Sequence, residues 1–268
     1  MTVNTLAIDT AAGFFSVALR AGDRVYHFEE QVAAGSLNAA QRLQAQASSP
    51  GPRPEGARAG AVSHHSELLL DCAGFLTEKA GIKPADIGAV LVMKGPGSFT
   101  GLRIAYAAAK GIALALGSRM SAFPSLDVMA FPFSRWPGLV MPVINARKGC
   151  FFTALYQDGR LLAGPMDTHA EAEDFQAVLK PFFIDKNQKN QRIFLTGPDA
   201  AMLKDALKPF AKDETLVLDP LGLRGYAPIL LEVEKKCDLP DNDTELFYSG
   251  PEYLRKSDAE LNLKKQLP

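Results

Sequence analysis

The chain has 268 residues, 47% of them hydrophobic and 22% charged, which suits one large or two small globular domains. Its 29 Lys and Arg residues nearly balance its 30 Asp and Glu residues, so the chain is not expected to bind nucleic acid or an anionic membrane on its own. Three scattered cysteines, Cys72, Cys150 and Cys237, exclude a disulfide framework and a Cys-x-x-Cys metal or redox site.

The N-terminal segment predicts three strands, because apolar and small residues fill 6–8, 14–20 and 24–28 between turn residues. Residues 33–61 differ: they hold nine Ala, four Gly and three Pro, and no aromatic residue, Val or Ile. A segment with so little to bury cannot offset its ordering entropy. We therefore predict a flexible insertion over 33–61.

Two helices and a buried strand are predicted next. Apolar residues recur at helical spacing over 66–79, and the continuous apolar run 87–93 is typical of a strand buried on both faces. A glycine-rich turn precedes a long helix over 99–116, whose only charges are Arg103 and Lys110. Its most apolar part, 104–116, is too short to span a bilayer. One side of this helix can rest on a sheet, and the other needs a second cover.

The second half of the chain repeats this plan. A shift of 136 positions places Ile8 on Ile144 and Gly13 on Gly149, and further elements follow as a helix over 170–179, a strand over 192–195 and a helix over 200–207. Two duplicated β-β-β-α-β-α lobes are the pattern of the actin-like ATPase fold, an α/β class. We predict a first lobe over 1–118, a second lobe with a C-terminal helical region over 119–255, and a tail over 256–268.

Two turns are candidates for facing a nucleotide or another anion. One is Asp9-Thr10 after the first strand, and the other opens the long helix, where glycines let backbone N–H groups approach an anion. This glycine-rich turn is neither a P-loop nor a nucleophile elbow. The alternative to an anion-binding role is a tight turn that only caps the helix. The candidate residues are Asp9, Thr10, Gly95, Gly97, Ser98 and Thr100.

No metal-ligating or catalytic residue is predicted. His64 and His65 are adjacent and lack a His-x-x-x-His partner, while His27 and His169 are interpreted as lone, solvated residues. No spacing supports a Ser-His-Asp triad or another nucleophile–base pair. The N-terminus shows no basic region followed by an apolar one, so no signal peptide and a cytoplasmic location are expected.

Four motifs together resemble the TsaB family, once labelled glycoprotease-like. They are Ile8-Asp9-Thr10 with Ser16-Val17-Ala18-Leu19, His65-Ser66-Glu67-x-Leu69-Leu70, Gly95-Pro96-Gly97-Ser98-Phe99-Thr100-Gly101-Leu102-Arg103, and Pro251-x-Tyr253-Leu254-Arg255. The resemblance is close over 5–30 and 65–130 and looser over 138–255. Asn145 and Cys150 depart from the residues common in the family.

The resemblance implies a non-catalytic subunit of the complex that installs threonylcarbamoyl on adenosine 37 of ANN-decoding tRNAs. Its implied partners are a TsaD-type catalytic subunit, a TsaE-type ATPase and, when alone, a second copy, with tRNA met only through the complex. No cofactor is implied for this chain alone, and adenine nucleotide at the complex interface stays open. The implied interface residues are His65, Ser66, Leu68, Leu69, Cys72, Phe75, Leu102, Arg103, Ala105, Tyr106 and Ala109.

Two other functions stay open as alternatives. A nucleotide-dependent phosphotransferase of the same fold needs a carboxylate to orient metal or water. Asp9 is such a carboxylate, but the corresponding turn of the second lobe, 145–149, begins with Asn145. A peptidase is the less favoured alternative, because no nucleophile–base pair is visible.

Overall fold

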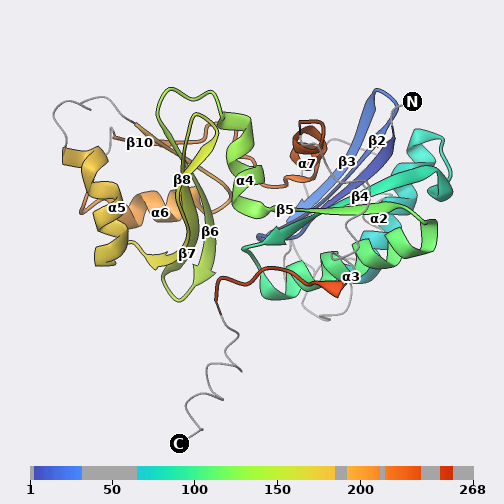
Figure 1. Cartoon of the computed structure of the whole chain (residues 1–268), viewed down its shortest axis with the longest axis horizontal. Helices are drawn as coiled ribbons and strands as arrows, with labels where there is room; N and C mark the ends of the chain where they lie inside the picture. Colours follow the sequence, from blue (N-terminus) through green and yellow to red (C-terminus); the bar gives the residue numbers. More distant parts are fainter. Residues whose placement is uncertain (1–2, 32–64, 185–191, 212–214, 237–247, 256–268) are drawn as a thin grey trace, which may run out of the picture. The chain divides into compact units, whose positions relative to one another are not determined.

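The structure, a computed structural model, describes residues 3–31, 65–184, 192–211, 215–236 and 248–255 (Figure 1). The predicted insertion 33–61 and tail 256–268 lie outside these residues. The chain forms two compact units, each with a five-stranded sheet. Unit 1 comprises Met1–Lys94, Thr100–Phe123 and Gly225–Gly250, and unit 2 comprises Gly95–Phe99, Pro124–Arg224 and Pro251–Pro268.

The sheet of unit 1 has the strand order β3-β2-β1-β4-β5, with β1 antiparallel to β2 and parallel to β4. The parallel pair requires a crossover, which α2 provides. The elements of this unit are β1 (Asn4–Asp9), β2 (Phe14–Ala21), β3 (Arg24–Gln31), α2 (His65–Ala80), a 3-10 turn (Pro84–Asp86), β4 (Ile87–Gly95), α3 (Phe99–Leu116), β5 (Arg119–Pro124) and α7 (Ala227–Glu234).

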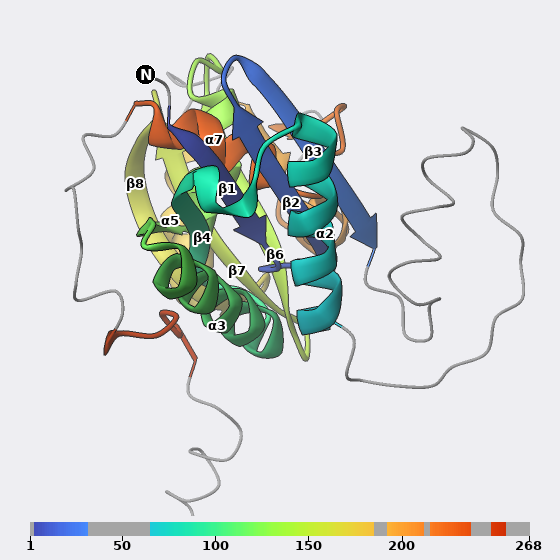
Figure 2. The ribbon, with the colours of Figure 1, turned by 90° about the vertical axis from the view of Figure 1, so that its right-hand side faces the viewer.

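Helices cover both faces of this sheet. Figure 2 shows α2 and α3 side by side on one face, and their buried residues share a hydrophobic core with β1, β2 and β4. The third helix, α7, packs on β1 and β2 from the other face (Figure 1). Its Leu230 and Leu231 are fully buried. Cover on both faces explains why β4 is apolar almost throughout.

Unit 2 has the strand order β10-β9-β6-β7-β8. Its α5 and α6 share a core with the sheet through Phe175, Leu179, Leu203 and Leu207, while α4 packs on β6 and β7. The elements are α4 (Ser125–Ala130), a 3-10 turn (Phe131–Phe133), β6 (Leu139–Arg147), β7 (Cys150–Gln157), β8 (Arg160–His169), α5 (Glu173–Ile184), β9 (Ile193–Thr196), α6 (Ala200–Leu207) and β10 (Leu216–Leu218).

The two units share one topology, so the predicted duplication and the fold class are confirmed. Read from the outer hairpin, the orders β3-β2-β1-β4-β5 and β8-β7-β6-β9-β10 correspond strand for strand. The shift of 136 places Phe14–Ala21 of β2 on Cys150–Gln157 of β7. It also carries the first residue of β3, Arg24, onto the first residue of β8, Arg160.

The division of the chain differs from the expected boundary between 118 and 119. Unit 1 extends to Phe123 because β5 completes its sheet, and it takes residues 225–250 from the far end of the chain. The helix that follows β5, α4, packs in unit 2, whereas the helix that follows β10, α7, packs in unit 1. Each unit therefore contains a helix that follows, along the chain, the last strand of the other unit's sheet.

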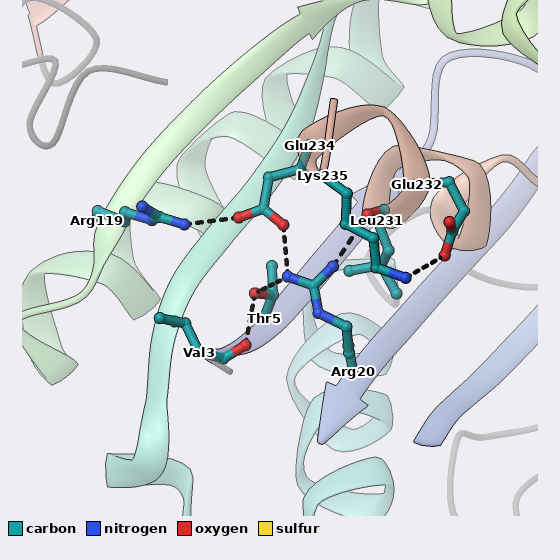
Figure 3. Close-up of polar contacts among 8 residues, drawn as sticks. All are labelled: Val3, Thr5, Arg20, Arg119, Leu231, Glu232, Glu234 and Lys235. Carbon is teal, nitrogen blue, oxygen red and sulfur yellow. Dashed lines mark hydrogen bonds and ion pairs between the residues drawn. The ribbon is translucent and has the colours of Figure 1, made fainter. Parts of the chain in front are cut away.

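A buried ion network fastens α7 to unit 1 (Figure 3). Arg20 of β2 and Arg119 of β5 bind the two carboxylate oxygens of Glu234 at 2.5 and 2.7 Å. Arg20 also donates hydrogen bonds to the Leu231 carbonyl at 3.0 Å and the Thr5 hydroxyl at 2.9 Å. The Arg20 and Glu234 side chains are only 6% and 4% exposed, so the network is shielded from water.

Candidate partner interface and anion-facing turns

Most of the predicted interface residues lie in the core of unit 1. Seven of them are at most 5% exposed: Leu68, Leu69, Cys72, Leu102, Ala105, Tyr106 and Ala109. The reason is that α2 and α3 need these apolar stripes to pack on their own sheet. Phe75 is half-buried against the same core, with the Lys79 ammonium 5.4 Å from its ring centroid.

A second apolar surface faces outward on the same two helices. On α3 this surface consists of small and apolar residues that are three or four positions apart. On α2 it consists of a leucine and of a glycine that lies one helical turn after it. We call this surface the outer face, and its residues are Leu70, Gly74, Ala107, Gly111, Leu114 and Ala115. Leu70 is 55% exposed and Leu114 is 70% exposed. Arg103, a predicted interface residue, is exposed beside it, while the side chains of His65 and Ser66 are outside the described part.

The composition of the outer face is compatible with the packing of another helix. Ala107, Gly111 and Ala115 recur every four residues and are exposed, and such a row of small residues lets a second helix approach closely. By length and composition alone α3 is also apolar enough to cross a membrane. However, its other face packs on the sheet of unit 1, as in any helix that covers an α/β sheet. The same test is passed by core helices, so it is weak evidence for a membrane span.

The Asp9 carboxylate is held in a structural role. One oxygen accepts the Ala11 N–H at 2.9 Å, and the other accepts the Tyr226 N–H at 2.8 Å, directly before α7. Burial raises the pKa of Asp9 to about 6, which the two N–H donors oppose and the negative charge of Glu29 reinforces. Both oxygens therefore already bind the backbone, which weakens the case for Asp9 as an orienter of metal or water.

Within unit 1, the first candidate turn contacts the start of α3. The Thr10 hydroxyl donates to the Gly101 carbonyl at 2.7 Å, next to Thr100 in the first turn of α3. Gly95 has φ 114°, a backbone conformation that only glycine adopts readily. Gly97 and Ser98 are half-buried and Thr100 is exposed. No described contact joins Asp9 to the residues of this turn.

Unit 2 repeats both turns, with the amide Asn145 at the position of Asp9. The Asn145 side-chain oxygen accepts the Arg147 N–H at 2.7 Å, as Asp9 accepts that of Ala11. Gly197 has φ 101°, close to the value at Gly95 in the matching position. Asp199, which follows this glycine, accepts the Asn145 N–H at 2.8 Å, and burial raises its pKa. The duplication thus extends to single hydrogen bonds, while the chemistry of the two turns differs.

The interpretation of His169 as a lone histidine is wrong. Its Nε2 lies 3.0 Å from the Cys150 Sγ, so a nucleophile and a base do meet in unit 2. The two residues are 19 positions apart and face each other only through the pairing of β7 with β8. Spacing along the chain carries no signal for such a pair, whereas the strand register would have revealed it.

The sequence of this chain is similar to those of known proteins. Residues 25–217 match the family model described as "TsaD: tRNA N6-adenosine threonylcarbamoyltransferase". The tRNA threonylcarbamoyladenosine biosynthesis protein TsaB of Escherichia coli (strain K12) is 31% identical over 200 residues, which is 73% of this chain and 82% of that protein. The chain belongs to the TsaB family. The TsaB of Bacillus subtilis (strain 168) is 27% identical over 211 residues, 74% of this chain and 82% of that protein.

Solved structures agree with the TsaB assignment at the level of the fold. "YeaZ from Pseudomonas aeruginosa" matches with a TM-score of 0.60 and 22% identity over 88% of this chain and 92% of that chain. A second Pseudomonas aeruginosa structure, of an uncharacterised protein with similarity to peptidase YEAZ, matches with a TM-score of 0.64 and 22% identity over 95% of this chain and 100% of that chain. The sequence relatives confirm the resemblance to TsaB that the sequence motifs indicate, and these structures confirm its fold.

Proposed function

We propose that this chain is a non-catalytic subunit in tRNA threonylcarbamoyladenosine biosynthesis, and that it acts by binding a TsaD-type catalytic subunit. The names of its TsaB relatives place those proteins in this biosynthesis. The observation that carries the binding role is the outer face, where Leu70 and Leu114 are more than half exposed on helices that cover the sheet of unit 1.

The two duplicated turns favour a non-catalytic role. A phosphotransferase of this fold needs a carboxylate that is available to metal or water. Asp9 instead binds two backbone N–H groups, and its counterpart is the amide Asn145. Adenine nucleotide bound where the chain meets its partner is compatible with this role, because the glycine-rich turn opens α3, which carries part of the outer face.

The outer face is also the surface at which the chain binds its partners in this proposal. A TsaD-type subunit covers the outer face in the complex, and a second copy of this chain covers it when the catalytic subunit is absent. A TsaE-type ATPase completes the assembly. The net charge of −1 gives the chain no strong attraction for phosphates of its own, so tRNA is met through the complex, in the cytoplasm.

The experiment is size-exclusion chromatography with light scattering, on the chain alone and mixed with the TsaD of the same organism. The wild type is expected to form a heteromeric peak. Leu114→Asp and Ala107→Arg each bury a charge without a partner at the interface, which should raise the Kd by at least about 100-fold.

Leu161→Asp is the matched control, because Leu161 is 50% exposed on β8 of unit 2. It should keep the heteromeric peak, and all three variants should keep the circular dichroism of the wild type. Retention of the complex by both outer-face variants would overturn the proposal. Loss of the complex by Leu161→Asp as well would place the interface elsewhere.

A further inference from the structure

The pairing of β7 with β8 gathers three reactive or polar side chains and one aromatic ring on one face of the sheet in unit 2. Cys150 lies opposite His169, and Phe152 lies opposite Asp167. Residues two apart on a strand share a face, as do residues directly opposite each other, so all four side chains project from the same side. On that face the Cys150 Sγ and the His169 Nε2 are 3.0 Å apart.

Arg255 adds a fixed positive charge to this group. Its guanidinium binds both carboxylate oxygens of Asp167, one at 2.6 Å, and donates to the Ala146 carbonyl at 3.1 Å. It lies 6.0 Å from the centre of the Phe152 ring. The hydrogen bond to Asp167 is the largest cause that raises the pKa of Arg255, burial opposes it, and the Cys150 side chain adds a smaller rise. The sulfur of Cys150 therefore contacts an imidazole and interacts electrostatically with a permanent cation.

The local backbone makes room for the imidazole. Gly149 has φ 77°, and a Cβ atom at this position would come within 3.3 Å of the His169 Nδ1. A side chain here would therefore press on the ring that contacts the sulfur. Cys150 is 8% exposed, whereas His169 beside it is exposed, so the Cys150–His169 pair lies at the surface of unit 2 and the proposal requires a small molecule to approach the sulfur from the side of the imidazole.

We propose that Cys150 is a reactive thiol, activated by His169 and Arg255, which small hydroperoxides oxidise to a sulfenic acid. His169 takes the thiol proton, and Arg255 stabilises the thiolate that is formed. The thiolate attacks the outer oxygen of the hydroperoxide, an S–O bond forms and the O–O bond breaks. The sulfur loses two electrons, and the leaving alkoxide or hydroxide takes the proton back from the imidazolium as an alcohol or water.

This site is independent of the proposed partner binding, since its residues all belong to unit 2 and none lies on the outer face. It also differs from the peptidase alternative, because oxidation by a peroxide needs only a nucleophile, a proton carrier and a stabilising charge. Asp167 acts as a positioning residue, because its carboxylate binds the guanidinium of Arg255 and fixes the place of that charge.

The experiment uses the full-length chain treated with hydrogen peroxide at pH 7, with dimedone present to trap sulfenic acid. Mass spectrometry of the peptides then gives the rate at each cysteine. Because the imidazole of His169 lies 3.0 Å from its sulfur and can take the thiol proton, Cys150 is expected to react roughly tenfold faster in the folded chain than in urea. Cys72, fully buried in α2, is the internal control and should be protected by folding.

His169→Gln is expected to lower the Cys150 rate to that of the unfolded chain and to make it rise with pH like a free thiol. Arg255→Gln should lower the rate several-fold, and Trp136 fluorescence checks that unit 2 is folded. His27→Gln, which replaces an exposed histidine of unit 1, should leave the rate unchanged. The proposal is overturned if folded Cys150 reacts no faster than unfolded Cys150, or if His169→Gln leaves its rate and pH profile unchanged.

Discussion

Asp9 and Asn145 occupy the same turn in the two units, and both accept a backbone N–H from the residue two positions later. Only Asp9 adds a second bond, to the Tyr226 N–H in front of α7. The carboxylate is thus a link between β1 and the end of the chain. Because it is buried near Glu29, this link is also sensitive to protonation.

The pH dependence of stability follows from the raised pKa of Asp9. In the folded chain it is about 6, against an ordinary value of 3.8, so the folded state binds a proton that the unfolded state releases. The contribution of Asp9 is therefore complete below about pH 4 and decreases as pH rises to 6, by up to roughly 3 kcal/mol. Asp9→Asn should remove this slope, as measured by urea unfolding between pH 4 and 7.

Asp23→Asn is the control for this measurement, because Asp23 is exposed in the turn between β2 and β3. It should keep the slope of the wild type. An unchanged slope in Asp9→Asn would show that the buried carboxylate does not titrate in this range.

At the scale of one element, neighbouring residues of α2 have opposite roles. Leu69 is fully buried and Leu70 is 55% exposed. Leu69→Ala should lower the free energy of unfolding by about 2–5 kcal/mol, because it leaves a cavity in the core. Leu70→Ala should change it by less than about 0.5 kcal/mol, and should weaken partner binding instead. Equal losses of stability in urea unfolding would contradict this division of α2 into two faces.

The attachment of α7 depends on the charge of Glu234. Glu234→Ala leaves the guanidinium of Arg20 buried without its counterion, and is expected to destabilise unit 1 by about 3–5 kcal/mol. Glu232→Ala breaks only the pair with Lys235, whose two side chains are about half exposed, and should be nearly neutral (Figure 3). Thermal unfolding of both variants distinguishes the two cases, and similar melting temperatures would argue against the network.

The sequence predicts elements well where strong local signals mark both ends. The bounds of α3 agree with the prediction because a glycine-rich turn precedes it and Gly117 follows. Which face of α3 rests on the sheet could not be predicted, since small and apolar residues occupy both sides of this helix. The residues that the sequence assigns to the interface include Leu102, Ala105 and Ala109, which the structure places in the core, whereas Ala107 and Leu114 are exposed.

At the scale of the whole molecule, the duplication was predictable and the exchange of helices was not. Matching residues 136 positions apart report shared ancestry, and the strand orders bear this out. That α4 packs in unit 2 and α7 in unit 1 depends on contacts between distant parts of the chain, which a local pattern does not encode. The pairing of Cys150 with His169 was missed for the same reason.

The exchange predicts how fragments behave. Residues 1–123 alone lack the helix that covers one face of the unit 1 sheet, and should aggregate because β1 and β2 would expose an apolar face. The same fragment joined by a Gly/Ser linker to residues 225–250 should fold. Circular dichroism and light scattering test both fragments, and a folded, monomeric 1–123 fragment would show that α7 is dispensable.

The late position of α7 also matters while the chain is being made. Glu234, the last residue of α7, is synthesised 111 positions after Phe123 (234 − 123). At ribosomal rates of about 5–20 residues per second, the first sheet waits roughly 6–22 s for its final helix. During that interval the nascent chain presents an uncovered sheet to its surroundings. The protein should accordingly depend on chaperones that bind at the ribosome more than its modest size suggests.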